Sequence, residues 1–322
     1  MKRSSKSTKR PGGTQAQGSP DSAAAAPKWP SYKGKAKLVG TSSSGRVTVY
    51  VDPSLGASAL QNAQDLLNDA DRIVNANDGL FGTTGGPVSA IVFALGGATD
   101  GTGGADHMGC DYTTGNAIEV DASYGNPERV SALFEAELSE CSMNGNLCGE
   151  STGEALSRWC AAVIGNNALS DFATAPQWAQ DGMPNWVDQT DNTDQDADSI
   201  GCGMAFLSWL LSQGYVLGKI APAMVALGDA GTLAQLYAQL TGDSAGNAWA
   251  KFQSAVQVLP NGAISDDPFA GMPNAAESVR SAESSISSPA PASERITIGL
   301  CVPKSKRLLP PVKKMQASKH RQ

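Results

Sequence analysis

Residues 126–143 read NPERVSALFEAELSECSM, and here the chain changes from strand-like to helix-like patterning. Pro127 suits the first turn of a helix, because the N–H that proline lacks would have no partner there. The apolar side chains then recur at the three-to-four spacing of one helical face: Val130, Leu133, Phe134, Leu138 and Cys141. We therefore expect an amphipathic helix that begins near Pro127.

Three stretches before this helix are patterned as strands. RVTVYVD (46–52) and NAIEVDA (116–122) alternate apolar and polar residues, and SAIVFAL (89–95) is a continuous apolar run between glycines. Apolar residues at helical spacing over 60–73 predict a helix between the strands 46–52 and 89–95. The Gly-rich residues 96–111 are predicted to form a loop, because their glycines lack the spacing of a dinucleotide-binding turn.

After residue 143 the patterning stays helical. Helices are expected at 150–165, 171–188, 199–214, 216–228, 230–241 and 245–257. Strands followed by helices indicate an α+β fold. We expect one domain over 41–262, with a small mixed or antiparallel sheet and a helix in 41–125 and a mostly helical half in 126–262.

The two ends of the chain are basic and the body is acidic. Residues 1–40 hold nine Lys and Arg against one acid, Asp21, and residues 291–322 hold eight against one acid, Glu294. The whole chain nevertheless carries a net charge of -7. We expect disordered tails at 1–40 and 263–322, because Ser, Pro, Gly and Lys cannot bury enough apolar surface to offset ordering.

The charge distribution and the hydropathy of the chain limit its possible binding partners. An acidic body repels nucleic acid, so only the basic tails are expected to contact it, and weakly. No run of about 18 apolar residues occurs, which excludes a membrane-spanning helix. No signal peptide is evident in the first thirty residues, so a cytoplasmic location is the default expectation.

Histidine and cysteine limit the chemistry. His107 and His320 are the two histidines of the 322 residues, which excludes zinc sites built on several imidazoles. The six cysteines show no C-x-x-C spacing, so a thiolate zinc site is not predicted. Cys141 and Cys148 flank a Gly/Asn turn and could be bridged, while buried reduced thiols are an equal alternative.

FEAELSE (134–140) resembles the active-site helix of the thermolysin-like zinc peptidases, the gluzincins, whose motif is H-E-x-x-H. Glu137 then matches the catalytic glutamate, and Ala136 and Glu140 match the two histidines. QDGMPNWV (180–187) is similar to the segment that supplies the third zinc ligand, with Asp181 at the ligand position, and GCGMAFLSWL (201–210) resembles the apolar helix behind the site. The resemblance implies a zincin-like fold and a peptidase cleft.

The departures from this motif weaken the expected zinc site. A methyl group at Ala136 cannot bind a metal, and carboxylates at Glu140 and Asp181 suit zinc less well than imidazoles do. His107 is the candidate for a nitrogen ligand from the Gly-rich loop. The alternative is that Glu137 and Glu140 are ordinary solvated helical acids, as Glu154 and Arg158 are expected to be in an exposed pair.

A second candidate site is acidic. Asp191, Asp194, Asp196 and Asp198 lie in a segment whose D-x-D-x-D pattern opens like a calcium loop, although the Gly and Glu of such a loop are missing. The alternative is a turn whose side chains cap the helix that begins near Ser199.

Three functions follow from these patterns. The first is a catalytically degenerate metallopeptidase-like protein that binds a peptide or protein in the former substrate cleft. The second is an active metal-dependent hydrolase with Glu137 as general base and Glu140, Asp181 and His107 on a zinc ion. The third is a binding module stabilised by calcium at Asp191–Asp198.

Overall fold

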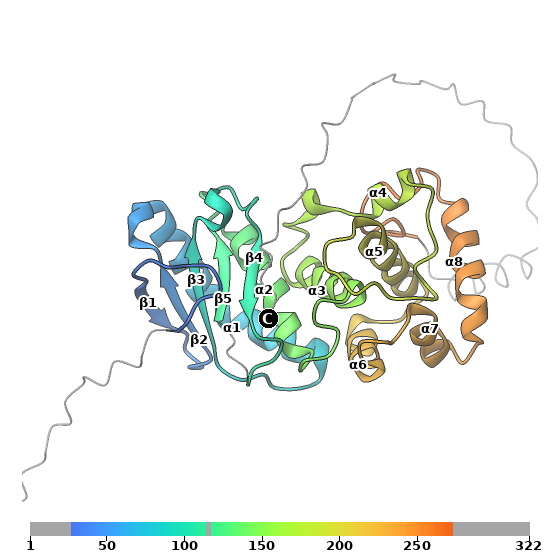
Figure 1. The fold of residues 1–322 in the computed structure, drawn as a ribbon, viewed down its shortest axis with the longest axis horizontal. Helices are drawn as coiled ribbons and strands as arrows, with labels where there is room; N and C mark the ends of the chain where they lie inside the picture. Colours follow the sequence, from blue (N-terminus) through green and yellow to red (C-terminus); the bar gives the residue numbers. More distant parts are fainter. Residues whose placement is uncertain (1–26, 114–116, 273–322) are drawn as a thin grey trace, which may run out of the picture.

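The protein is described by a computed structural model that covers residues 27–113 and 117–272. A sheet with two helices forms one half, and a group of helices forms the other (Figure 1). The described part extends beyond the predicted domain at both ends, because residues 27–40 pack on the sheet and residues 263–272 on the helices. Residues 27–40 and 263–272 of the predicted tails 1–40 and 263–322 are thus part of the described structure, and the rest of both tails lies outside the described residues.

The sheet has five strands in the order β1-β2-β3-β5-β4. The strands are β1 (Lys37–Thr41), β2 (Val47–Val51), β3 (Val88–Phe93), β4 (Ala105–Met108) and β5 (Ala117–Asp121). The central strands β2, β3 and β5 are parallel, and both edge strands are antiparallel to their neighbours. The prediction of a small mixed sheet is confirmed.

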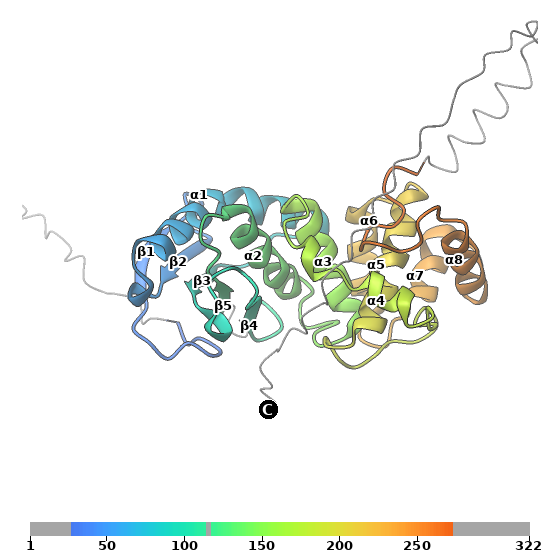
Figure 2. The same ribbon diagram turned by 90° about the horizontal axis from the view of Figure 1, so that it is seen from above.

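Two helices cover one face of this sheet (Figure 2). They are α1 (Gly56–Phe81) and α2 (Pro127–Ser142), and they pack on each other as well as on the strands. Alternate strand residues such as Val49, Val92 and Val120 point toward them and form a buried core. The predicted apolar stripe of α2 lies in this core, and all five of its residues are buried.

The N-terminal segment covers the other face of the sheet. Trp29 and Tyr32 pack edge-on against Tyr50 and Phe93. Glu119, fully buried on β5, accepts hydrogen bonds from the backbone N–H groups of Ser31 and Tyr32 and from the Ser31 hydroxyl.

The helical half is built around a buried helix. Its helices are α3 (Ser151–Ile164), α4 (Ala175–Gln180), α5 (Ala197–Ser212), α6 (Leu217–Leu227), α7 (Leu233–Thr241) and α8 (Ala248–Gln257). The residues of α5 from Ser199 to Leu210 are all buried, as expected for an apolar helix. None of the helices in the described residues has the length and apolarity that crossing a bilayer requires.

Some details of the sequence analysis were wrong. The helix expected at 171–188 is limited to α4, which ends before Gly182 and Pro184. The predicted loop 96–111 contains strand β4, which is short and carries polar residues, as edge strands often do. The suggested Cys141–Cys148 bridge does not form, because Cys141 is buried on α2 while Cys148 is bonded to Cys110. Cys141, Cys160 and Cys202 are buried free thiols, in agreement with the alternative expectation.

Candidate metal centre

Helix α2 carries two glutamates away from its apolar stripe. The Asn126 side chain caps the helix by accepting a hydrogen bond from the Arg129 N–H, and Pro127 occupies the first turn. Val130, Phe134 and Leu138 pack in the core beneath the sheet, whereas Glu137 and Glu140 point toward His107 of β4. The exposed fractions of their side chains are 15% and 17%, so these acids are not the freely solvated pair of the alternative interpretation.

The third member of the site comes from the edge of the sheet. His107 lies on β4, opposite Ile118 of β5, at the sheet edge that faces the helical half (Figure 1). Its Nδ1 contacts the carbonyl oxygen of Gly109. This contact fixes the ring so that Nε2 points toward α2, and the Cys110–Cys148 disulfide ties the loop that follows β4 to the loop before α3.

These three side chains converge. His107 Nε2 lies 2.8 Å from Glu140 Oε2 and 3.9 Å from Glu137 Oε2. One ligand atom from each of the three residues lies within 4.8 Å of the other two, and no other such group occurs among the described residues. The structure therefore brings together three of the four residues that the sequence suggested for a metal hydrolase.

The electrostatics of the site reflect this crowding. Burial alone would lower the pKa of His107, but its contacts with Glu140 and Glu137 outweigh burial and raise that pKa to about 10. Burial, together with the charge of Glu140, raises the pKa of Glu137 well above its usual range. Burial also acts to raise the pKa of Glu140, but the hydrogen bond with His107 lowers it overall. Without a bound ion, the contact with His107 favours the ionised form of Glu140, while burial favours the neutral form of Glu137.

A fourth carboxyl group adjoins the site. Glu154 of α3 makes a side-chain hydrogen bond to Glu140, and its Oε1 accepts a hydrogen bond of 2.6 Å from Arg158 Nε. The sequence predicted the pair of Glu154 with Arg158, but the expectation that it is exposed was wrong, since the exposed fractions of these side chains are 17% and 15%. Burial raises the pKa of Glu154 to about 7, although Arg158 opposes the shift.

A cleft of about 330 Å³ opens beside these groups. Glu137, Glu154 and Arg158 line it on the polar side, together with Asp266. Its apolar lining comes from both halves of the molecule: Leu133, Trp159, Leu169, Phe172 and Met204. A volume of this size holds a small ligand or a few side chains of a peptide.

Asp181 does not join the group. It follows α4, where its carboxylate accepts a hydrogen bond of 2.6 Å from Gln177, and it lies next to Asp198. It is neither among the ligand atoms that converge on His107 nor among the residues that line the cleft. The proposed third ligand from this segment thus has no geometric support.

The aspartates of the suggested calcium segment have structural roles. Asp196 caps α5 by accepting hydrogen bonds from the N–H groups of Asp198 and Ser199, as the alternative interpretation expected. No three of Asp191, Asp194, Asp196 and Asp198, all in the described part, bring carboxylate oxygens within 4.8 Å of one another. Calcium binding remains a prediction from sequence.

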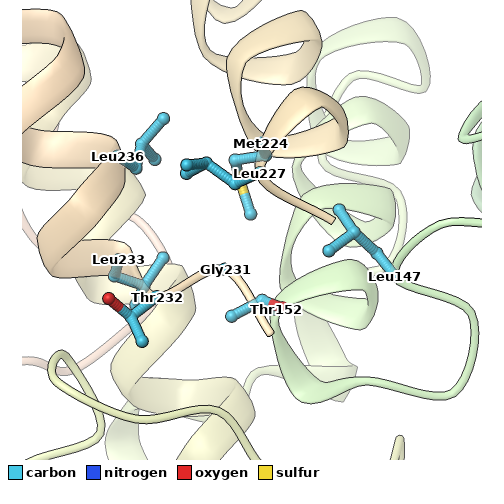
Figure 3. A pocket seen from close by; sticks show the side chains of 8 residues that line it. All are labelled: Leu147, Thr152, Met224, Leu227, Gly231, Thr232, Leu233 and Leu236. Carbon is cyan, nitrogen blue, oxygen red and sulfur yellow. The ribbon is translucent and has the colours of Figure 1, made fainter. Parts of the chain in front are cut away.

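A second hollow, between α3, α6 and α7, is apolar and very small (Figure 3). Its volume is about 10 Å³, which is barely enough for one water molecule. Leu233, Leu236 and Met224 are among the side chains that surround it, and none of the lining residues is titratable. It is a packing defect. Of the two cavities, only the larger cleft is lined by titratable side chains.

The chain was also compared with known proteins. No protein-family model matches it, and no curated protein sequence matches it. Function must therefore be argued from the site itself.

Proposed function

We propose that the protein binds one divalent metal ion at His107 and the neighbouring glutamates and uses it for hydrolysis in the adjoining cleft. The observation that carries this proposal is the convergence of His107, Glu137 and Glu140 within 4.8 Å at the edge of the cleft. One imidazole nitrogen and several carboxylate oxygens suit a first-row dication such as Zn²⁺ or Mn²⁺.

The side chains divide into ligands and a general base. His107 and Glu140, 2.8 Å apart, are the closest pair and lie behind the cleft lining. Glu154 interacts with Glu140 but is not among the atoms that converge on His107, so it is a neighbour of the ligands, and no described residue replaces Asp181 as a third ligand. Glu137 lies 3.9 Å from His107 and lines the cleft. The charge of a bound dication would favour its ionised form, which can accept a proton from a water molecule that attacks the substrate.

A divalent ion in this position would supply Lewis-acid chemistry, polarising a carbonyl group and making a nearby water more acidic. The residues of the chain supply orientation. Gly109 and the Cys110–Cys148 disulfide hold the His107 ring, and the walls of the cleft exclude water from part of the substrate. The mixed sheet followed by helices also supports the resemblance to the gluzincin scaffold, with a peptide as the substrate class that this resemblance implies.

The proposal is tested by metal analysis of natively purified protein. We expect one Zn²⁺ or Mn²⁺ per chain in the wild type and in Glu128→Ala, a matched change on the first turn of the same helix. Glu140→Ala should lower the affinity for the ion by at least about 100-fold. Equal metal content in Glu140→Ala and wild type, or none in either, would contradict the proposal.

The general base is tested separately. Glu137→Gln should retain the ion and lose about 10²–10⁴-fold in hydrolysis of a peptide library. Loss of the ion in this variant would instead make Glu137 a ligand.

A specific observation favours a second candidate, a degenerate peptidase that binds a peptide or protein without cleaving it. His107 pairs with Glu140 and Arg158 pairs with Glu154, so the charges of the site are satisfied without an ion. A metal-free wild-type protein that binds peptides in the cleft, with no turnover on the library, would support this candidate.

The disulfide bears on the compartment. Disulfide bonds persist in oxidising compartments and are rare in the reducing cytosol. The Cys110–Cys148 bond therefore favours export over the cytoplasmic location expected by default. Alkylation of cysteines in freshly lysed cells, followed by mass spectrometry, distinguishes the two: Cys110 and Cys148 should escape alkylation.

A further inference from the structure

Arg158 is an unusual neighbour for a cation site. It lies one turn after Glu154 on α3, and its Nε donates a hydrogen bond of 2.6 Å to the Glu154 carboxylate. Its Nη1 donates to the carbonyl oxygen of Phe172 at 2.9 Å, which fixes the guanidinium between α3 and the turn Ser170–Phe172. The side chain is only 15% exposed and lines the same cleft as Glu137.

The charged side chains around the site form ion pairs with one another. His107 is within hydrogen-bond distance of Glu140, and Arg158 is bonded to Glu154. Arg158 also interacts electrostatically with Glu140, so its charge reaches the centre of the group. His107 can lose its proton when an ion binds, but an arginine side chain keeps its charge at all relevant pH values.

We propose that Arg158 is a built-in counter-cation that occupies Glu154 and holds the affinity of the site for divalent ions below the level its carboxylates would otherwise give. This inference rests on the proposed metal site and adds the residue that sets its affinity. A dication must approach a fixed positive charge, and that charge already offsets the negative charge of Glu154. Where solvent screens most of the interaction, a neighbouring unit charge changes the affinity for a dication by roughly 10–100-fold.

A purely structural role for Arg158 predicts the opposite change in metal-ion affinity when the side chain is removed. If Arg158 only supports the fold, or only holds Glu154 in place for an ion, its removal loosens the site and the affinity falls or stays unchanged. A gain in affinity on removing a buried side chain is not expected from structural damage. The sign of the change therefore distinguishes an electrostatic role from a supporting one.

The experiment uses the full chain and measures binding of Zn²⁺ and Mn²⁺ by isothermal titration calorimetry. Arg158→Met removes the charge and keeps an apolar side chain of similar length. Arg158→Lys keeps the charge. Arg129→Met is the matched control, because Arg129 is also buried and ion-paired, with Asp171, but lies two turns before Glu137 on α2.

The expected result is a 10–100-fold tighter affinity in Arg158→Met, with Arg158→Lys and Arg129→Met within about threefold of wild type. An affinity in Arg158→Met that is equal to or weaker than wild type overturns the inference but leaves the metal site intact. Binding in Arg158→Met and none in wild type supports the inference and refutes a metal-dependent wild-type enzyme. No binding in any of these proteins refutes both.

Discussion

The acids on α2 differ in role because of the direction in which each side chain points. Glu137 and Glu140 face β4 and α3, whereas Glu135 points into the packed interior and is fully buried. Neither carboxyl oxygen of Glu135 has a hydrogen-bond partner among the described residues. Burial raises its pKa well above the usual range, against the pull of Arg72. Glu135 is therefore a cost to stability rather than part of the site.

Replacing this side chain should stabilise the protein. We expect Glu135→Met to raise the free energy of unfolding by about 1–2 kcal/mol at pH 7, because it removes an unsatisfied buried polar group of similar size. Since the pKa of Glu135 is raised in the folded state, the wild type loses stability as the pH rises above about 4.5. The difference in the free energy of unfolding between Glu135→Met and the wild type should therefore widen with pH. Urea unfolding at pH 5 and pH 8 measures it. Destabilisation at both pH values would show that Glu135 has a partner.

The free cysteines give a second prediction at this scale. Burial raises the pKa of Cys202 to about 12 and those of Cys141 and Cys160 well above the usual value. Because the thiolate is the reactive form, these three thiols should not react in the native protein at pH 8.

A Cys301→Ser background removes the one cysteine outside the described residues. In that background a thiol reagent should detect no thiol in the native protein and the three buried free thiols after denaturation. Detection of five thiols without a reductant would show that Cys110 and Cys148 are not bonded.

At the scale of elements, the disulfide connects the edge of the sheet to the start of the helical half. Cys110 lies three residues after His107, and the loop that the bond closes spans 38 residues. Closing a loop of that length stabilises a protein by about 4 kcal/mol in the chain-entropy account. The same bond limits the movement of β4 relative to α2 and α3.

Breaking the bond should affect both stability and the site. We expect Cys110→Ser with Cys148→Ser to lose about 3–4 kcal/mol in urea unfolding and to bind the metal ion more than tenfold more weakly. Cys202→Ser, which removes a buried cysteine outside the bond, is the control for ion affinity. Unchanged affinity in the double variant would mean that β4 is positioned by the sheet alone.

Glu119 of β5 holds the segment 27–36 together with the aromatic packing of Trp29 and Tyr32. Its carboxylate accepts hydrogen bonds of 2.6 to 3.1 Å from backbone N–H groups of the segment. Glu119→Ala should therefore cost about 2–4 kcal/mol and release Trp29 from Tyr50. A red shift of tryptophan emission under native conditions reports this release, with Trp29→Phe as the control. An unshifted spectrum would show that aromatic packing alone holds the segment.

The elements were predictable where a single periodicity dominates. The stripe of α2 and the alternation of β2 each bury one clear face, and β3 is a continuous apolar run that is buried almost throughout, so their patterns identify them. Strand β4 was missed because its four residues lie among glycines and its existence depends on pairing with β5. His107 was singled out as a candidate ligand, but its approach to Glu140 follows from that pairing, which local sequence does not encode.

At the scale of the whole molecule, the sheet half and the helical half meet at the site. His107 comes from the sheet edge, Glu137 and Glu140 from α2, and Glu154 and Arg158 from α3. The sequence analysis treated Glu154 as a surface residue because a Glu-x-x-x-Arg spacing is typical of exposed helices. Packing of α3 against α2 buries the pair instead, and only the tertiary structure reveals that.

The same consideration explains the error with Asp181. Its motif match was local, and the position of that segment relative to α2 depends on how α4 packs against α5. This packing places Asp181 near Asp198 and away from His107. The structure thus brings together the candidates on α2 and β4, and the carboxyl group that adjoins them, Glu154, comes from α3.

The central claim is that a metal ion binds between His107 and Glu140, next to Glu137. It is tested most directly by a crystal structure of the full chain grown with Zn²⁺ or Mn²⁺ and measured at the absorption edge of that metal. We predict one anomalous peak about 2.0–2.2 Å from His107 Nε2 and from a Glu140 oxygen. A metal peak at Asp191–Asp198 alone, or no peak with His107 still bonded to Glu140, would contradict it.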